Sequence, residues 1–261
     1  MDSTAYQTFT DALIAQAAAD PAVIGLVALG SMADLSRRDN WSDHDFFWIV
    51  EGGQQERYRT NLDWLPRADE IVLHFREGAH GLKVMYGDGH LIEFAVFDLA
   101  ELAYARVNDY AVLLDQGDIT AHMAQIERTS QPATINLSSE LIETLCLIQV
   151  GSGRAARGEV ISGSVFIKTY VVLHLLRVIT ATFPGQHTAV LDSLDPYRRF
   201  ERAFPQFAPA LHAALLLPPL ECALALLEFI EREIRPHTAD FPQAGFETVR
   251  GYVLRCLKAN N

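Results

Sequence analysis

The stretch VIGLVALGSMADLSRRDNWSDHDFFWIV, Val23–Val50, contains two apolar runs separated by a polar segment. The first run ends at Gly30-Ser31, and the second starts at two aspartates, Asp43 and Asp45, that flank a histidine. Apolar runs of this length bounded by turn residues predict buried strands. Carboxylates at the start of a buried strand are costly unless a positive charge lies between them. The stretch therefore predicts a strand, a short helix from Ser31, and a second strand that carries an acidic pair.

The segments around this stretch predict a mixed sheet with a few helices. Residues 5–19 have apolar positions at three- and four-residue spacing, which predicts a helix, and a second helix is expected within residues 54–65. Three further strand-like runs follow, EIVLHFR, GLKVMYG and HLIEFAVF. The last two are joined by Asp88-Gly89, a strong hairpin signal.

From about residue 138 the pattern is helical to the end of the chain, with each segment closed by proline or glycine. The change falls in the polar stretch ERTSQPATINLSS. We therefore expect an α+β chain with an N-terminal sheet domain, residues 1–132, and a C-terminal helical bundle, residues 133–261.

Composition narrows the class of protein. The chain has 261 residues, 49% of them hydrophobic, and a net charge of −12, which argues against a nucleic-acid partner and suits a cationic small molecule. Three widely spaced cysteines favour a reducing cytoplasm. The opening does not have the pattern of a signal peptide, and no uncharged apolar run reaches the roughly 20 residues that span a membrane. We expect a cytoplasmic protein without a membrane segment.

The acidic pair predicts a metal site. Residues two apart in a strand point to the same side, about 7 Å apart at the backbone, so the carboxylates of Asp43 and Asp45 can converge. Unpaired, they would raise each other's pKa, whereas divalent cations, and magnesium in particular, remove the conflict. His44 points the other way and is expected to be structural or solvent-facing rather than a ligand. The alternative for Asp43 and Asp45 is a solvated turn before the strand.

Glu93 and the Gly30-Ser31 turn extend this hypothesis. Glu93 lies within an otherwise apolar strand, where a carboxylate is rarely buried unless it is paired or bound to metal. If its strand adjoins that of Asp45, it completes a three-carboxylate cage of the kind used in two-metal phosphoryl chemistry, or acts as a general base. Gly30 and Ser31 can admit a phosphate at a helix start. The alternatives are an edge glutamate facing water and an ordinary strand-to-helix turn.

The spacing Gly-Ser, eleven residues, Asp-x-Asp, with a later strand carboxylate, resembles the DNA polymerase β-type nucleotidyltransferase superfamily. Within it the chain is most similar to the lincosamide nucleotidyltransferases, over nearly its whole length. The similar segments are GSMADLSRRDNWSDHDFFWIV, HLIEFAVFDLAEL, ARGEVISGSVFIKTYVVLHLL and SLDPYRRFERAF. The second carboxylate is Asp45 where the lincosamide enzymes typically have glutamate, and superfamily members use either residue.

The resemblance implies a reaction and roles. Gly30 and Ser31 would hold the triphosphate of ATP or another nucleoside triphosphate, Asp43 and Asp45 would bind two Mg²⁺ ions, and Glu93 would be the third ligand or general base. A hydroxyl of a small acceptor, possibly a lincosamide or aminoglycoside antibiotic, would attack the α-phosphate and release pyrophosphate. The resemblance also implies a homodimer and a role in antibiotic resistance.

Several cations are secondary candidates for binding the nucleotide. Lys168 interrupts an apolar helix and, like Arg157 or Arg154, could stabilise charge on pyrophosphate. A snorkelling lysine and a cation at a helix C-terminus are the alternatives. The segment with Tyr197, Arg198, Arg199 and Arg202 could stack on or clamp a nucleotide, although a solvated helix face is the favoured interpretation. Trp41 is either a wall of the site or a packing residue.

Two other classes of function stay open from the sequence. One is a protein-modifying or antitoxin-like nucleotidyltransferase that acts on a partner protein. The other is a nucleotide-binding module without catalysis, which three costly carboxylates argue against.

Overall fold

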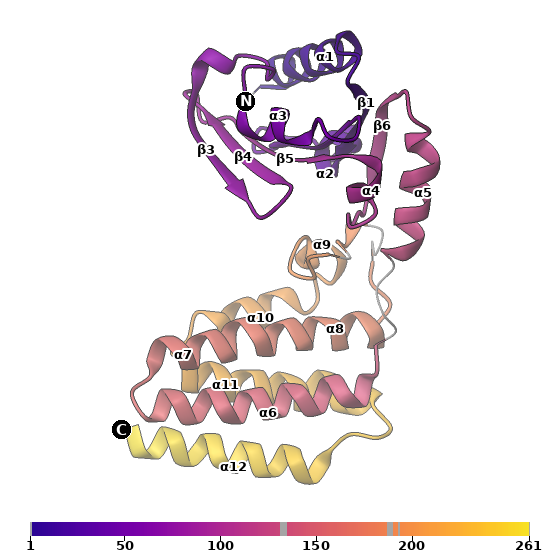
Figure 1. Ribbon diagram of the computed structural model, residues 1–261. Helices are drawn as coiled ribbons and strands as arrows, with labels where there is room; N and C mark the ends of the chain where they lie inside the picture. Colours follow the sequence, from indigo (N-terminus) through magenta and orange to yellow (C-terminus); the bar gives the residue numbers. More distant parts are fainter. Residues whose placement is uncertain (1, 131–134, 187–189, 193, 261) are drawn as a thin grey trace. The chain divides into compact units, whose positions relative to one another are not determined.

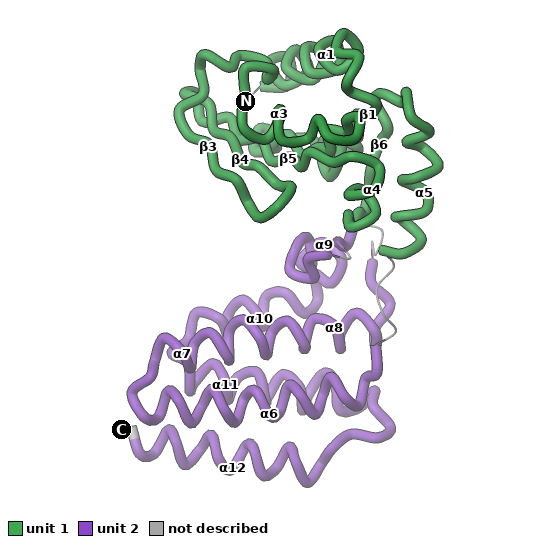
Figure 2. Tube along the Cα trace, viewed as in Figure 1, with its two compact units in different colours: residues 1–131 green, residues 132–261 purple. Residues whose placement is uncertain are grey.

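The chain forms two compact units, residues 1–131 and 132–261 (Figure 2). The computed structural model describes residues 2–130, 135–186, 190–192 and 194–260. The expected domain boundary between residues 132 and 133 lies outside the described residues. The first unit is built on a mixed sheet and the second on helices, so the predicted α+β class is confirmed.

A six-stranded sheet in the order β3-β4-β5-β2-β1-β6 forms the centre of the first unit (Figure 1). Its strands are β1 (Val23–Leu29), β2 (His44–Val50), β3 (Ile71–Glu77), β4 (Gly81–Tyr86), β5 (Leu91–Phe97) and β6 (Tyr110–Asp115). The neighbours β2 and β5 are parallel, and all other neighbours are antiparallel. The hairpin predicted at Asp88-Gly89 joins β4 to β5, whereas edge strand β6 was not anticipated from the sequence.

Helices cover both faces of this sheet. They are α1 (Ser3–Ala19), α2 (Gly30–Ala33), α3 (Gln55–Thr60), α4 (Leu99–Leu102) and α5 (Ile119–Thr129), with 3₁₀ turns at Leu35–Arg37 and Ala68–Glu70. Alternate residues of β2 enter different cores. Phe46 and Trp48 pack with α1, whereas Phe47 and Ile49 pack with α5. A strand that is buried on both faces reads as a continuous apolar run, which is why DFFWIV has no alternation.

The second unit is a helical bundle around a separate core. Its helices are α6 (Leu137–Ala156), α7 (Val160–Val165), α8 (Val172–Thr182), α9 (Phe200–Ala203), α10 (Ala208–Leu215), α11 (Pro219–Phe229) and α12 (Gln243–Asn260). π-helical turns at Phe166–Val171 and Ile230–Ile234 and a 3₁₀ turn at Arg235–His237 complete it. Helices α6 and α7 approach closely at Gly163, where an added Cβ would lie 2.9 Å from Ala155 Cβ and from Gly151 O.

One continuous helix among the described residues, Val160–Thr182, is long and apolar enough to cross a membrane by length and composition alone. It carries Lys168 and Arg177, and its Ile167 and Leu175 are fully buried in the bundle core. The core helix of a bundle meets the same two criteria, so this feature is weak evidence for a membrane span.

Candidate active site

Asp45 and Glu93 occupy paired positions on two neighbouring parallel strands. Asp45 on β2 is the register partner of Glu93 on β5. Paired residues of neighbouring strands project to the same face of a sheet, so the two side chains are neighbours. Both residues are half-buried. By strand alternation they point to the same face of the sheet as Phe47 and Phe97, which is the face that packs against α5. The fold therefore brings together two acidic residues that are far apart in the chain.

Lys83 continues this row of side chains onto β4, where it is the register partner of Glu93. Its Nζ lies 3.3 Å from Glu93 Oε1 and 3.4 Å from Glu77 Oε2. The hydrogen bond with Glu93 is the main cause that raises the pKa of Lys83. The sequence pattern did not predict this partner for Glu93, although a hairpin centred on Asp88 places residues 83 and 93 opposite each other.

The Gly30-Ser31 turn lies beside the Asp45 carboxylate. A Cβ added to Gly30 would be 3.9 Å from Asp45 Oδ2. Gly30 has a φ of 52°, in the left-handed region that favours glycine. The helix expected from Ser31 is a single turn, Gly30–Ala33, and the chain then passes into a 3₁₀ turn. The positive end of so short a helix is weak, so close backbone approach is the larger contribution that this turn can make to anion binding.

Arg37 fixes the turn from behind. Its Nη2 donates to the Gly30 carbonyl at 2.8 Å, and its Nη1 lies 2.7 Å from Asp109 Oδ2. The Gly30 N–H donates to the Asp109 carbonyl at 3.3 Å. These contacts tie the turn to the segment that leads into β6. The arginine side chain is only 14% exposed, and it is occupied by groups of the protein itself.

Tyr6 of α1 connects the turn with the acidic pair. Its hydroxyl donates to the Asp43 carbonyl at 2.8 Å, and the nearby Ser31 side chain acts to lower the pKa of the same phenol. Burial is the main cause that raises the pKa of Tyr6 to about 12, and the charges of Asp43 and Asp45 act in the same direction. The guanidinium of Arg38 lies over the ring, 4.2 Å from its centroid. Sequence reasoning missed Tyr6, and the one signal that could identify it is that a tyrosine on a buried helix face needs a partner for its hydroxyl.

His44 lies on the opposite face from Asp45, as strand alternation predicts, and is fully buried. Its Nδ1 is 2.8 Å from His90 Nε2, and its Nε2 is 2.9 Å from the Thr10 hydroxyl. The ring also stacks on Tyr6 with centroids 3.7 Å apart. Burial is the largest cause that lowers the pKa of His44 to about 3 and that of His90 to about 4. Both imidazoles are therefore neutral near pH 7 and serve as structural hydrogen-bonding groups.

The two cations expected to contact the nucleotide belong to the second unit. Lys168 Nζ donates to the Leu215 carbonyl at 2.8 Å, which places the ammonium at the C-terminal end of α10. Arg157 caps the end of α6 and lies 3.1 Å from Glu159 Oε1, with 63% of its side chain exposed. Each has a partner within its own unit. Their role toward a nucleotide stays a prediction.

The donor set suits a hard cation. Asp43, Asp45 and Glu93 offer only carboxylate oxygens, and magnesium is commonly held by one or two carboxylates together with water and substrate phosphates. Within the described ranges, no three histidine, cysteine, aspartate or glutamate side chains are grouped closely enough to hold a metal ion by themselves. Asp43 and Asp45 both act on the Tyr6 phenol, while Glu93 is paired with Lys83. The roles of Asp43, Asp45 and Glu93 as metal ligands stay a prediction.

Comparisons with known proteins give structural neighbours only. No family model and no curated protein sequence matches the chain. An aminoglycoside 6-adenyltransferase from Bacillus subtilis is similar with a TM-score of 0.32 and 12% identity, over 97% of this chain and 91% of that one. A nucleotidyltransferase-like protein from Exiguobacterium sibiricum 255-15 gives a TM-score of 0.28 and 11% identity, over 97% and 90%. Because both TM-scores lie below 0.5, we draw no functional conclusion from them.

Proposed function

We propose that the chain is a magnesium-dependent nucleotidyltransferase that moves AMP from ATP to a hydroxyl group of a small molecule and releases pyrophosphate. The observation that carries the proposal is the pairing of Asp45 with Glu93 on adjacent parallel strands, next to the Gly30 turn, where an added Cβ would lie 3.9 Å from Asp45 Oδ2. Nucleotidyl transfer needs a turn whose backbone a phosphate can approach and a group of carboxylates that can bind magnesium.

Each residue has a defined task in the proposed reaction. Gly30 and Ser31 bind the triphosphate, and Asp43 and Asp45 bind magnesium, which when present neutralises charge on the phosphates. The acceptor oxygen forms a bond to the α-phosphorus while the bond from that phosphorus to the bridging oxygen of pyrophosphate breaks. The acceptor proton passes to the Glu93 carboxylate, which Lys83 orients through the 3.3 Å contact.

The acceptor class follows from charge and from the family resemblance. With a net charge of −12, the chain favours a cationic acceptor over an anionic one. Hydroxylated antibiotics of the lincosamide and aminoglycoside classes are therefore the first acceptors to test. Labelled ATP distinguishes the alternative: label on a protein supports a protein-modifying enzyme, and label on an added antibiotic supports the proposal.

The first prediction concerns Glu93. Glu93→Gln should lower the rate of pyrophosphate release by about 100-fold or more, because it removes the proton acceptor. Glu77→Gln is the matched control, since Glu77 also pairs with Lys83 but is not the register partner of Asp45.

Asp45→Asn should abolish turnover and the magnesium dependence of ATP binding in calorimetry. Equal activity of the Glu93 and Glu77 variants, or ATP binding that is unchanged by magnesium and by Asp45→Asn, would contradict the assignment.

A further inference from the structure

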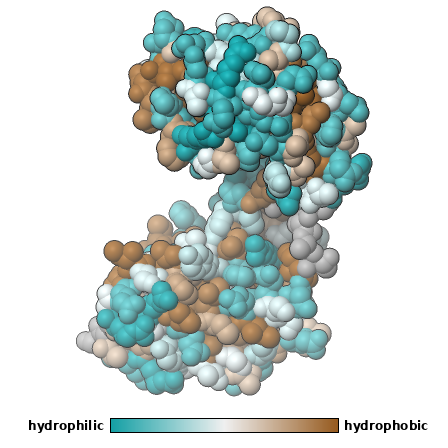
Figure 3. Space-filling view, in the orientation of Figure 1, coloured by the Kyte–Doolittle hydropathy of each residue, from teal (hydrophilic) through white to brown (hydrophobic). Residues whose placement is uncertain are grey.

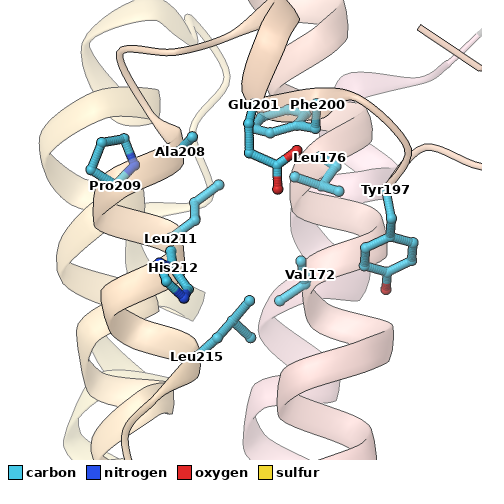
Figure 4. Close-up of a pocket in the computed structure, with 10 residues that line it drawn as sticks. All are labelled: Val172, Leu176, Tyr197, Phe200, Glu201, Ala208, Pro209, Leu211, His212 and Leu215. Atoms are coloured by element: carbon cyan, nitrogen blue, oxygen red, sulfur yellow. The ribbon is translucent and has the colours of Figure 1, made fainter. Parts of the chain in front are cut away.

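The second unit contains a pocket of about 470 Å³ between α8 and α10. Figure 4 shows Val172 and Leu176 of α8 facing Leu211 and Leu215 of α10 across it. Phe200 also contributes to the lining, and Val172, Leu176 and Leu211 are almost fully buried. Pockets of this volume with mostly apolar walls are typical of sites for small organic molecules. On the face seen in Figure 3, apolar surface is also more abundant over the second unit than over the first.

Polar groups at the pocket are few, and two of them lack partners. The Glu201 carboxylate extends into the space between the two helices, and the His212 ring lines the α10 wall (Figure 4). Within the described part of the chain, neither side chain makes a hydrogen bond or an ion pair. Tyr197 differs, because its hydroxyl donates to the Thr169 carbonyl. Glu201 is therefore a solvent-exposed negative charge at the edge of the apolar walls, and no described side chain pairs with it.

The two ends of the pocket carry opposite charge. Leu215 closes the end away from Glu201, and its carbonyl accepts a hydrogen bond from Lys168 Nζ at 2.8 Å. An anionic group would be repelled at the Glu201 end, and a cationic group would be repelled near Lys168. A ligand that satisfies both ends has its positive charge near Glu201 and an apolar body that extends between the helices toward Leu215.

We propose that this pocket binds a small amphiphilic amine, with the ammonium group against Glu201 and the apolar body between α8 and α10. The site goes beyond nucleotidyl transfer and does not depend on it, because binding needs neither nucleotide nor magnesium. The charge complementarity selects an amine over an alcohol or an acid of the same shape.

The test compares three probes with one carbon skeleton: 4-phenylbutylamine, 4-phenylbutan-1-ol and 4-phenylbutanoate. Binding to the full chain is measured by calorimetry without nucleotide. The amine should bind more tightly than the alcohol by about fivefold at low salt, and the acid should bind least, because an exposed ion pair contributes about that factor. The preference for the amine should shrink as salt is added.

Variants locate the site. Glu201→Gln should remove the preference for the amine and leave the affinity for the alcohol unchanged. Glu228→Gln is the control, an exposed glutamate of α11 that does not line the pocket. Ala208→Phe, which fills the pocket, should weaken all three probes at least tenfold while circular dichroism shows an intact fold. The inference is overturned if no probe binds, if amine and acid bind alike, or if Glu201→Gln and Glu228→Gln behave the same.

Discussion

At the residue scale, Tyr6 is the connection on which the geometry of the candidate site depends. One phenol contacts the Asp43 carbonyl and the Ser31 side chain, which belong to different segments of the site. It does so from α1, a helix whose apolar spacing predicts a face packed against the sheet. Residue type and position in the chain indicate that such a hydroxyl needs a partner, but they do not say which one.

Tyr6→Phe therefore tests the connection. The variant should lose about 1 kcal/mol of unfolding free energy, because it removes one net hydrogen bond. It should also weaken MgATP binding by about fivefold, because Ser31 and the start of β2 are no longer held together. Tyr58→Phe is the control: Tyr58 is an equally buried tyrosine that donates to Asp20 at 2.7 Å, away from the site. A similar loss of MgATP affinity in both variants would show that Tyr6 acts through stability alone.

At the scale of elements, a buried hydrogen-bonded chain attaches α1 to the sheet. Thr10 of α1 contacts His44 at the start of β2, and His44 contacts His90 just before β5. Phe9 and Tyr86 pack around His90 with ring centroids 4.7 and 5.3 Å away. Because His44 separates Asp43 from Asp45, the same contacts that hold the helix also fix the segment that presents the two carboxylates.

The hydrogen bonds that link Thr10, His44 and His90 should make the stability of the first unit sensitive to acid. The pKa of His90 is about 4 in the folded protein and about 6.5 in the unfolded chain, so the unfolded state takes up the proton first as the pH falls. The free energy of unfolding is therefore at its full value above pH 6.5. It falls progressively as the pH decreases toward 4, by up to about 3 kcal/mol for His90. His44 contributes in the same direction.

Urea unfolding at pH 7.5 and 5.0, followed by tryptophan fluorescence, measures the effect, because all three tryptophans lie in the first unit. His90→Gln should be less stable than the natural chain at pH 7.5 but should lose less stability between the two pH values. His122→Gln, at an exposed position of α5, should keep the original pH dependence. Identical pH dependence in the His90 variant would exclude this role.

At the scale of the whole molecule, the two units have separate hydrophobic cores, and the unfolding of each can be followed by a different spectroscopic signal. The tryptophans report the first unit, whereas the long helices of the second unit contribute most of the far-ultraviolet dichroism. The core of the second unit depends on close helix approach, since Gly163 leaves no room for a side chain against Ala155 and the Gly151 carbonyl.

Gly163→Val should therefore destabilise the second unit by about 1–3 kcal/mol, because the backbones of α6 and α7 must separate. The expected result is a lower midpoint in thermal denaturation followed by circular dichroism at 222 nm, with a smaller change in the tryptophan transition. Gly245→Ala, at a position where an added Cβ would lie 3.9 Å from Leu145 Cδ1, should leave both transitions nearly unchanged. An unaltered dichroism midpoint for Gly163→Val would disprove the close-packing role.

The local sequence determined the fold class and most of the helices and strands of this protein. The apolar runs around Gly30-Ser31 and Asp43-x-Asp45, the Asp88-Gly89 hairpin and the helical pattern after residue 138 predicted the α+β class, because strand and helix periods depend on near neighbours. The same alternation put His44 and Asp45 on opposite faces. Edge strand β6 was missed, since its short run YAVLLD has its partner, β1, far away in the chain.

Only the tertiary structure decided which distant side chains meet. Parallel pairing of β2 with β5 puts Glu93 beside Asp45, and the β4 register gives Glu93 its partner Lys83. The contact of Tyr6 with Asp43 and Ser31, and the pocket between α8 and α10, likewise join segments that no local pattern relates. The physical reason is that periodicity fixes the direction of a side chain within its own element, whereas its neighbours depend on strand order and helix packing across the whole unit.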